Sequence, residues 1–170
     1  MHLRVHRSKN VGSAEGDLAN DPAAAAANLE VGAPEPLEGA VATEAEGCVE
    51  LFGDEVARMV YSKQWQHREE GLKRVLQQLH SAPSSRAAKV VGSVNKKSLN
   101  DKNPAVYMAA LNLFRAAAKL KDESGRPLEV KGVFDPLMPL VIAQLSNNNV
   151  RVKDDTARAL VELSQVCFIV

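Results

Sequence analysis

Aromatic residues and cysteines are scarce in this chain of 170 residues. Aromatics make up 4% of the residues, and there are two cysteines. A core with so few rings, built from Leu, Val and Ala, favours stacked helices over a β-sandwich, which depends on β-branched and aromatic side chains. Cys48 and Cys167 form no C-x-x-C pair, so the sequence predicts neither a disulfide framework nor a zinc site. Such cysteine usage fits a reducing compartment.

Long uncharged apolar runs are also missing. Residues 1–10 carry charges and no apolar run follows them, so the sequence predicts no secretory signal. No apolar stretch reaches the length that spans a membrane. We therefore expect a protein of the cytoplasm and cytoskeleton, without a membrane partner.

The formal net charge is zero, but the charges are unevenly distributed. Residues 1–45 hold three basic and seven acidic residues, whereas the remainder holds 18 basic and 14 acidic residues. Nucleic acids usually require a denser basic patch than this mildly basic remainder provides. The charge pattern favours an acidic protein partner and no nucleic acid.

The N-terminal part has almost no large apolar side chains. It is rich in Ala, Gly, Glu and Pro, as in the runs 22–27 and 34–36. Such a segment buries too little surface to offset its chain entropy. We predict that residues 1–47 are disordered and that residues 48–170 form the folded domain.

Six helical patterns follow, separated by short breaks. They span about residues 49–61, 65–80, 85–99, 104–121, 135–145 and 150 to nearly the end. The second shows the strongest amphipathic stripe, and the fourth is apolar on two sides, which predicts a helix between two neighbours. Asn103-Pro104 is a typical N-cap and first residue of a helix.

Matching positions recur in the second, fourth and sixth helices. Gly71 and Ala110 are 39 positions apart, and Ala110 and Thr156 are 46 positions apart. Repeats of this length with two helices each are typical of HEAT or armadillo arrays. The sequence therefore predicts an all-α fold, an α-solenoid of about three HEAT-type helical hairpins. Because residues 166–170 are apolar, we expect an open apolar face at the end of the array.

Candidate catalytic groups are poor, and we predict no enzyme, no metal and no cofactor. His67 lacks the H-E-x-x-H spacing of a zinc site. The run 92–98 has a Lys-Ser pair but no second glycine before it, unlike a phosphate-binding loop. The acidic pairs Glu69-Glu70 and Asp154-Asp155 point in different directions on a helix and do not converge on one atom.

A binding surface is the better prediction. In stacked hairpins the turns inside successive units line up along one edge, here residues 62–66, 99–104 and 146–151. The candidate binding residues are one ring and a row of cations on these turns and the helical turns that follow: Lys63, Trp65, Arg68, Lys102, Arg151 and Lys153. Two alternatives stay open. Trp65 lies seven residues before Leu72 and could extend the apolar stripe of that helix, and the cations could simply be solvated.

The run from Tyr61 to Leu72 resembles the opening turn of a TOG domain, the tubulin-binding HEAT array of microtubule regulators. With its Tyr-Ser-Lys-x-Trp-x-x-Arg-Glu pattern, it is most similar to the centrosomal branch of that family, found at centrioles and ciliary tips. The resemblance implies that the turns bind the tubulin heterodimer or a microtubule end, with Trp65 as the anchor and Lys63 beside it. Lys102, Arg151 and Lys153 would then meet acidic tubulin surface. Other centriolar or ciliary-tip proteins are further implied partners.

Two other functions remain as alternatives. The first is a general HEAT or armadillo scaffold that holds a peptide or protein other than tubulin in its groove. The second is a regulatory piece of an enzyme complex. Mutation of the turn edge separates tubulin binding from the scaffold function, because a groove binder does not use that edge.

Overall fold

The computed structural model describes residues 32–167, with side chains described as far as Gln165. Within this range the chain is helical apart from its loops and one isolated antiparallel bridge between Lys121 and Pro127. The α-helices are α2 (Gly39–Phe52), α3 (Asp54–Tyr61), α4 (Trp65–Gln78), α5 (Ser84–Ser98), α6 (Pro104–Ala117), α7 (Lys131–Phe134), α8 (Met138–Ala143) and α9 (Val150–Cys167). Short 3₁₀ turns follow α4, α7 and α8 at Leu79–Ser81, Asp135–Leu137 and Gln144–Ser146.

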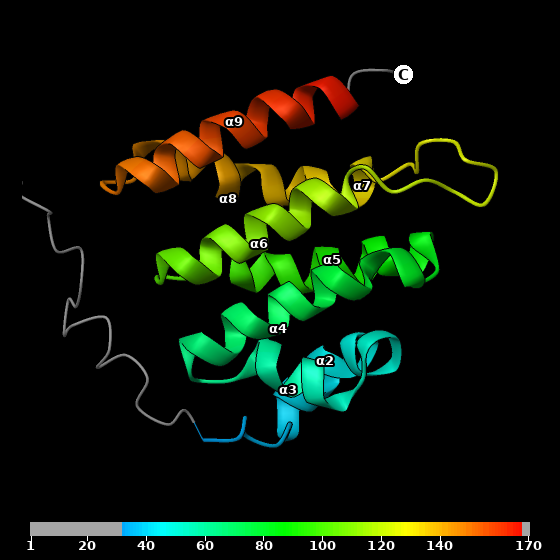
Figure 1. The fold of residues 1–170 in the computed structure, drawn as a ribbon, viewed down its shortest axis with the longest axis vertical. Helices are drawn as coiled ribbons and strands as arrows, with labels where there is room; N and C mark the ends of the chain where they lie inside the picture. Colours follow the sequence, from blue (N-terminus) through cyan, green and yellow to red (C-terminus); the bar gives the residue numbers. More distant parts are fainter. Residues whose placement is uncertain (1–31, 168–170) are drawn as a thin grey trace, which may run out of the picture. The chain divides into compact units, whose positions relative to one another are not determined.

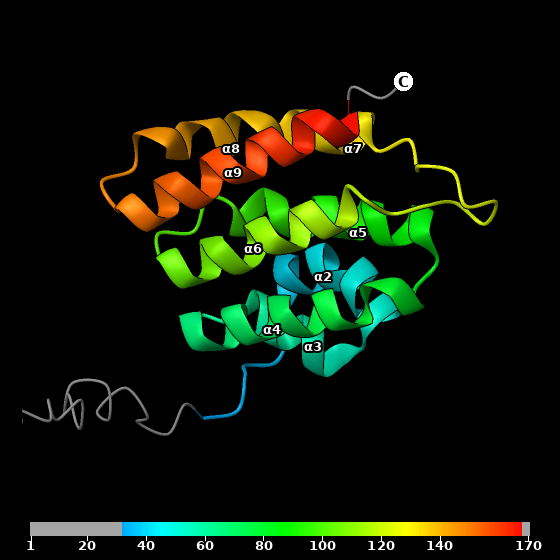
Figure 2. The same ribbon diagram turned by 45° about the horizontal axis from the view of Figure 1, so that its top comes forward.

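The helices form two layers of antiparallel hairpins. Helices α4, α6 and α9 lie side by side in one layer, and α2, α5 and the α7–α8 segment lie behind them (Figures 1 and 2). The hairpins are α3/α4, α5/α6 and α7–α8/α9, which confirms the predicted all-α solenoid of three HEAT-type units. A short loop joins the two helices of each hairpin, as expected for antiparallel neighbours.

Helix α6 lies at the centre of the core. Its residues on both predicted apolar sides are buried: Val106, Tyr107, Ala109, Ala110, Leu111, Leu113, Phe114 and Ala117. The rings of Phe114 and Phe134 meet edge to face with centroids 4.8 Å apart, which ties α6 to the last hairpin. The prediction that this helix is packed between two neighbours is confirmed.

The matching repeat positions are buried, and at Gly71 two helices approach closely. Gly71 is buried, and Ala110 and Thr156 are both 0% exposed. A Cβ atom on Gly71 would lie 2.6 Å from the backbone nitrogen of Val60. The absence of a side chain at Gly71 therefore lets α4 pack directly against the backbone of α3.

The first predicted helix is in fact two helices. Gly53 has φ 91°, a conformation that side chains disfavour, and it separates α2 from α3. The hydrophobic periodicity continues across the break through Phe52 and Val56, so the sequence pattern predicted one helix instead of two. Helix α2 also begins at Gly39, within the predicted linker, because Ala45 and Cys48 supply a buried face of small residues. Residues 1–31 of the predicted disordered segment lie outside the described residues.

The fifth predicted helix begins earlier and is irregular. Helical structure starts at Lys131, and 3₁₀ turns interrupt it before and after α8. Pro136 and Pro139 lack the backbone N–H that the interior of an α-helix uses. Each is the second residue of its own short helical element, where this N–H is not needed.

The last hairpin exposes large apolar side chains. Ile142 is 50% exposed and Val161 is 60% exposed. These two residues belong to α8 and α9, so both helices of the last hairpin leave apolar surface in solvent. The apolar residues 166–170 on which the prediction of an open face was based have no described side chains.

Candidate functional site

The three turns within the hairpins lie along one edge. They are Ser62–Gln64, Leu99–Asn103 and Asn147–Asn149, and both ribbon views place them at the same side of the helix layers (Figures 1 and 2). The long loop that contains Lys121 lies at the opposite side. The candidate binding residues on these turns therefore share one edge.

Trp65 is the first residue of α4 and is 37% exposed. Trp65 is therefore partly covered by the chain and partly open to solvent, and its role as an anchor for a partner stays a prediction. Lys63, two residues earlier, is exposed, and no described ion pair involves it. The first turn thus presents an indole and an ammonium group together.

Arg68 is not a free cation, because its guanidinium links the first turn to the second. It donates to both carboxylate oxygens of Asp101, at 2.7 Å and 3.2 Å, and to the backbone carbonyls of Ser62 at 3.1 Å and Lys63 at 2.8 Å. The side chains of Arg68 and Asp101 are 18% and 12% exposed. A two-bond, largely desolvated pair fixes geometry more strongly than a surface pair. Arg68 therefore holds the shape of the edge.

The second turn is built around Asp101 and Asn103. The Asn103 side chain accepts a hydrogen bond from the backbone N–H of Ala105 at 2.9 Å, and Pro104 follows as the first helical residue, so the predicted cap of α6 is confirmed. Asp101 Oδ1 accepts from the backbone N–H of Asn103 at 2.9 Å. Lys102 lies between these two residues and is exposed. The turn thus holds the Lys102 backbone in place and leaves its side chain in solvent.

The third turn carries Arg151 and Lys153 in the first turn of α9. The Arg151 side chain is 85% exposed and lies 3.9 Å from Asp155, a weak surface pair, and Lys153 is exposed. Val150 is 65% exposed beside them. The sequence analysis did not predict that Val150 is exposed on this turn. Its position directly after the break at residues 147–149 was the available signal.

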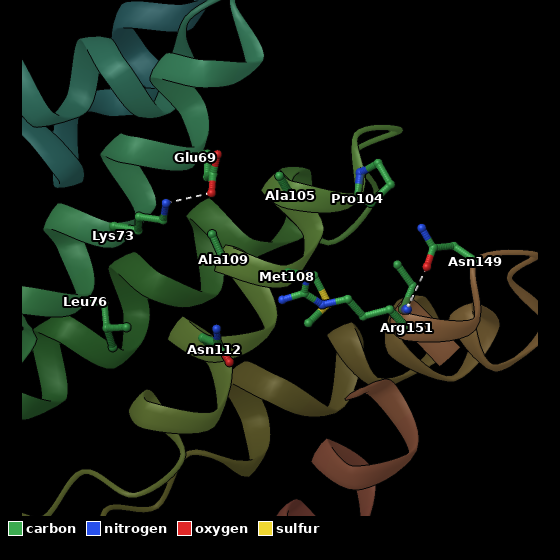
Figure 3. Close-up of a pocket in the computed structure, with 11 residues that line it drawn as sticks. Glu69, Lys73, Leu76, Pro104, Ala105, Met108, Ala109, Asn112, Asn149 and Arg151 are labelled. Atoms are coloured by element: carbon green, nitrogen blue, oxygen red, sulfur yellow. Dashed lines mark hydrogen bonds and ion pairs between the residues drawn. The ribbon is translucent and has the colours of Figure 1, made fainter. Parts of the chain in front are cut away.

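A shallow groove runs from the edge over the α4, α6 and α9 layer. Figure 3 shows its lining side chains, which come from α4, from the start of α6 and from the start of α9. Its lining includes the apolar side chains of Leu76 and Met108 and the polar side chains of Asn112 and Arg151. Lys73 pairs with Glu69 at 2.7 Å, so one cation of the groove is already neutralised. The groove is the surface that the scaffold alternative would use.

An extended segment, residues 32–38, crosses the first turn, and we call it the strap. Arg58 donates to the carbonyls of Pro34 at 2.9 Å and Glu35 at 3.2 Å, and the His67 ring donates to the carbonyl of Gly32 at 2.6 Å. The Ser62 hydroxyl donates to Glu35 Oε2 at 2.6 Å. This hydrogen bond is the main cause that lowers the pKa of Glu35, and Lys63 contributes through its backbone amide and its charge.

The sequence did not predict the strap, because most of its hydrogen bonds are accepted by backbone carbonyls. Such bonds do not require a particular residue type and leave no pattern in the sequence. Its one sequence signal was Leu37 in a run that is otherwise poor in large apolar residues, and Leu37 packs against the core. The strap lies beside Ser62 and Lys63, so it belongs to the same edge.

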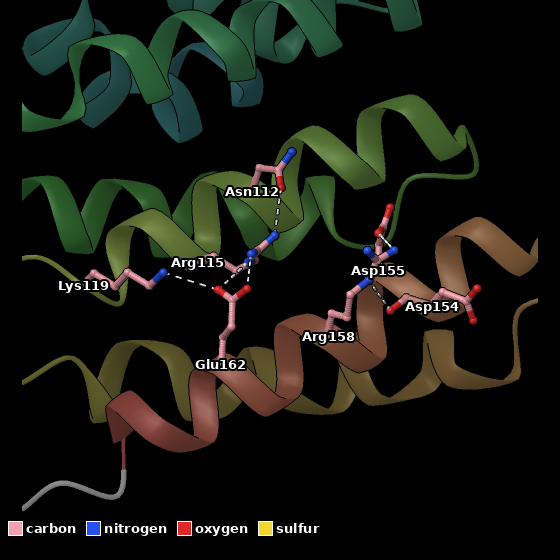
Figure 4. Close-up of polar contacts among 7 residues, drawn as sticks. All are labelled: Asn112, Arg115, Lys119, Asp154, Asp155, Arg158 and Glu162. Carbon is pink, nitrogen blue, oxygen red and sulfur yellow. Dashed lines mark hydrogen bonds and ion pairs between the residues drawn. The ribbon is translucent and has the colours of Figure 1, made fainter.

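The acidic pairs are structural. Figure 4 shows Asp155 bonded to Arg158, whereas Asp154 points away. The ammonium of Lys119 and the guanidinium of Arg115 both reach Glu162 across the α6–α9 interface.

The run 92–98 lies within α5, where Asn95 and Ser98 are buried, so its backbone is helical and does not form a phosphate-binding loop. In the part of the chain that the structure describes, no group of three His, Cys, Asp or Glu residues is placed to hold a metal ion. No helix among the described residues is long and apolar enough to cross a membrane.

Comparisons with known proteins agree with this architecture. The family model described as "Centrosomal protein CEP104, TOG domain" matches residues 42–166. Human Cep104 has a solved TOG domain that is 20% identical to this chain, with a TM-score of 0.61 over 79% of this chain and 55% of that one. A second solved structure, described as "CEP104 TOG domain", is 20% identical with a TM-score of 0.57 over 76% of this chain and 54% of that one. No curated protein matches.

The solved structures support the fold, and the family model supports the membership. The chain spans about half the length of the solved TOG domains. The resemblance read from the run Tyr61–Leu72 is confirmed, since that run lies inside the matched residues. With the match covering α3 to α9 and most of α2, this chain belongs to the family of the CEP104 TOG domain.

Proposed function

We propose that this chain is a non-enzymatic module that binds tubulin through the edge formed by its three hairpin turns. The observation that supports the proposal most directly is the placement of a partly exposed indole and several exposed cations on one edge of an array of this family. Tubulin and microtubule ends present acidic surface, which complements such an edge.

Trp65 is the proposed anchor. A tryptophan that is 37% exposed still has apolar area left to bury. Tryptophan is also enriched among residues that dominate binding energy. Its backbone is fixed at the start of α4, so the ring is presented at little cost in chain entropy.

Lys63, Lys102, Arg151 and Lys153 are the proposed cationic contacts. Exposed charges of this kind mainly raise the association rate and orient the encounter, and their effect falls with salt. Arg68 has a different proposed role, because Asp101 neutralises its charge. It keeps the first and second turns in register so that Trp65 and Lys102 face one partner.

The proposed location is the cytoskeleton at microtubule ends, centrioles or ciliary tips, with tubulin as the main partner and other centriolar or ciliary-tip proteins as further ones. No nucleic acid, membrane or cofactor is part of the proposal.

The test is tubulin binding by wild-type chain and by Trp65→Ala at low and high salt. Removing a central anchor typically costs about 2 kcal/mol or more, which corresponds to about a 30-fold loss of affinity. The matched control is Val161→Ala, because Val161 is 60% exposed and lies in the later part of α9, away from the third turn. It should bind as wild type does.

Two outcomes would count against the proposal. If Trp65→Ala unfolds the chain by circular dichroism, the ring has a core role. If instead Asn112→Arg, which fills the groove without touching the turns, abolishes binding while Trp65→Ala does not, the chain is a groove-binding scaffold.

A further inference from the structure

The strap places a carboxylate of the chain itself on the proposed tubulin-binding edge. Glu35 lies 27 positions before Ser62 in sequence, yet its Oε2 atom accepts the Ser62 hydroxyl at 2.6 Å. The Glu35 carboxylate therefore lies at the first turn, next to Lys63. Lys63 precedes Trp65, the first residue of α4, by two positions.

The receiving position is a built one. Ser62 is only 5% exposed, and its oxygen already accepts the backbone N–H of Gln64 at 3.1 Å. A hydroxyl carries one proton, so that proton is left for an outside acceptor, and a charged acceptor makes the stronger bond. The Lys63 ammonium adds attraction for a negative charge at the same place.

The backbone of the strap is fixed independently of the carboxylate. The Arg58 guanidinium holds the carbonyls of Pro34 and Glu35, and His67 holds the carbonyl of Gly32. The Glu35 side chain is itself solvent-accessible, so it is able to leave Ser62 while the strap stays in place. Exchange of this carboxylate for another needs only a side-chain rotation.

We propose that Ser62 and Lys63 form a carboxylate-binding subsite on the first turn, which Glu35 occupies in the free chain and which an acidic side chain of the partner takes over on binding. This inference rests on the proposed function, since it names the chemistry by which the first turn recognises an acidic protein surface. Glu35 is then a competitor built into the chain, and it limits the affinity of the edge.

The decisive variant is Glu35→Gln, with Glu38→Gln as its matched control. Both remove one negative charge from the strap, but the Glu38 side chain makes no hydrogen bond to the first turn and does not cap α2. An amide competes poorly with a carboxylate for the Ser62 hydroxyl and leaves Lys63 uncompensated. We expect Glu35→Gln to bind tubulin about three- to tenfold more tightly than Glu38→Gln at low salt, with the difference shrinking as salt rises.

A second measurement separates this inference from the proposed function. Poly-L-glutamate serves as a probe of the subsite without tubulin, followed through the amide resonance of Lys63 in ¹⁵N-labelled chain. We expect Glu35→Gln to bind the probe more tightly than Glu38→Gln does, and we expect Ser62→Ala to abolish that difference. If tubulin does not bind wild-type chain but the probe distinguishes these variants, the proposed function fails and the subsite stands.

Two results would overturn the inference. Equal affinities of Glu35→Gln and Glu38→Gln for both ligands would mean that only the overall charge matters. Weaker binding by Glu35→Gln, with an unchanged melting temperature, would mean that the Glu35 carboxylate supports the turn and does not compete with the partner.

Discussion

Arg68 of α4 and Asp101 of the α5–α6 turn form an ion pair with two hydrogen bonds between neighbouring hairpins. The Nε–Oδ2 distance is 2.7 Å and the Nη2–Oδ1 distance is 3.2 Å. Because the same guanidinium also holds two carbonyls of the first turn, this pair couples the positions of two turns that carry candidate binding residues. The edge is therefore one rigid unit over its first two turns.

Loss of this pair should destabilise the chain. Asp101→Asn keeps the shape and the acceptor for Asn103 but removes the charge, leaving a largely buried guanidinium without its partner. We expect the free energy of unfolding to fall by about 1–3 kcal/mol in urea titrations. Arg68→Lys should not restore the pair, because an ammonium lacks the planar fork. The control is Asp154→Asn, since Asp154 is exposed and takes part in no described ion pair. Equal, small effects of the two substitutions would contradict the structural role.

Charge reversal at the second turn should weaken tubulin binding without changing stability. Lys102 is exposed and its turn is held by other residues, so Lys102→Glu should leave the melting temperature unchanged. We expect an affinity loss of about five- to tenfold at low salt and less at high salt, mostly in the association rate.

Lys121→Glu is the matched control for this charge reversal, since it makes the same charge change on the exposed loop at the opposite side. If both substitutions weaken binding equally, tubulin responds to net charge and not to the edge.

The sequence predicts those parts of the fold that depend on local patterns. The apolar stripe of Leu72 and Val75 and the Asn103 cap depend on nearby residues, and each is confirmed. Period and capping are local properties, so a single sequence suffices to read them.

The features that were missed depend on contacts between distant residues. Arg68 and Asp101 are 33 positions apart, and Arg58 reaches Pro34 across 24 positions. The sequence predicted Arg68 on the edge, but it gave no sign that Asp101 neutralises the charge of Arg68.

The break at Gly53 was missed for a local reason, because Phe52 and Val56 keep the same helical periodicity across it.

Adding one methyl group to Gly71 should loosen the first hairpin. A Cβ atom there would lie 2.6 Å from the Val60 nitrogen and 2.9 Å from the Met59 Cβ, so α3 and α4 must move apart. We expect Gly71→Ala to lower the free energy of unfolding by about 1–3 kcal/mol, as overpacking usually does. Because the first turn joins these two helices, their separation also displaces Lys63 and Trp65, so tubulin affinity should fall as well.

Gly132→Ala is the control for this substitution, since no atom would lie within 4 Å of its new Cβ. It should be neutral or slightly stabilising, because alanine is the better helix former. A Gly71→Ala chain as stable as the Gly132→Ala chain would show that the helices have room to part.

The ion pairs of Glu162 should make the last hairpin sensitive to acid. Arg115 donates to the Glu162 carboxylate from α6, with Nε 3.0 Å from Oε2, and Lys119 lies 3.3 Å from the same oxygen (Figure 4). The hydrogen bond from Arg115 is the main cause that lowers the pKa of Glu162 from 4.5, and Lys119 adds to it. A carboxylate whose pKa is lowered on folding stabilises the fold above its unfolded pKa. That contribution disappears as the pH falls through the lower, folded value.

Comparing wild type with Glu162→Gln over pH therefore isolates this contribution. The two chains should differ in stability at pH 7. The difference should begin to shrink as the pH falls below about 4.5 and should vanish once the pH is below the lowered pKa of the folded state, where the wild-type carboxylate is neutral too. Glu123→Gln is a suitable control, because Glu123 is exposed and no described ion pair involves it. A Glu162→Gln difference that persists unchanged to pH 2 would show that the side chain acts through packing. In that case the α6–α9 interface does not depend on the charge of Glu162.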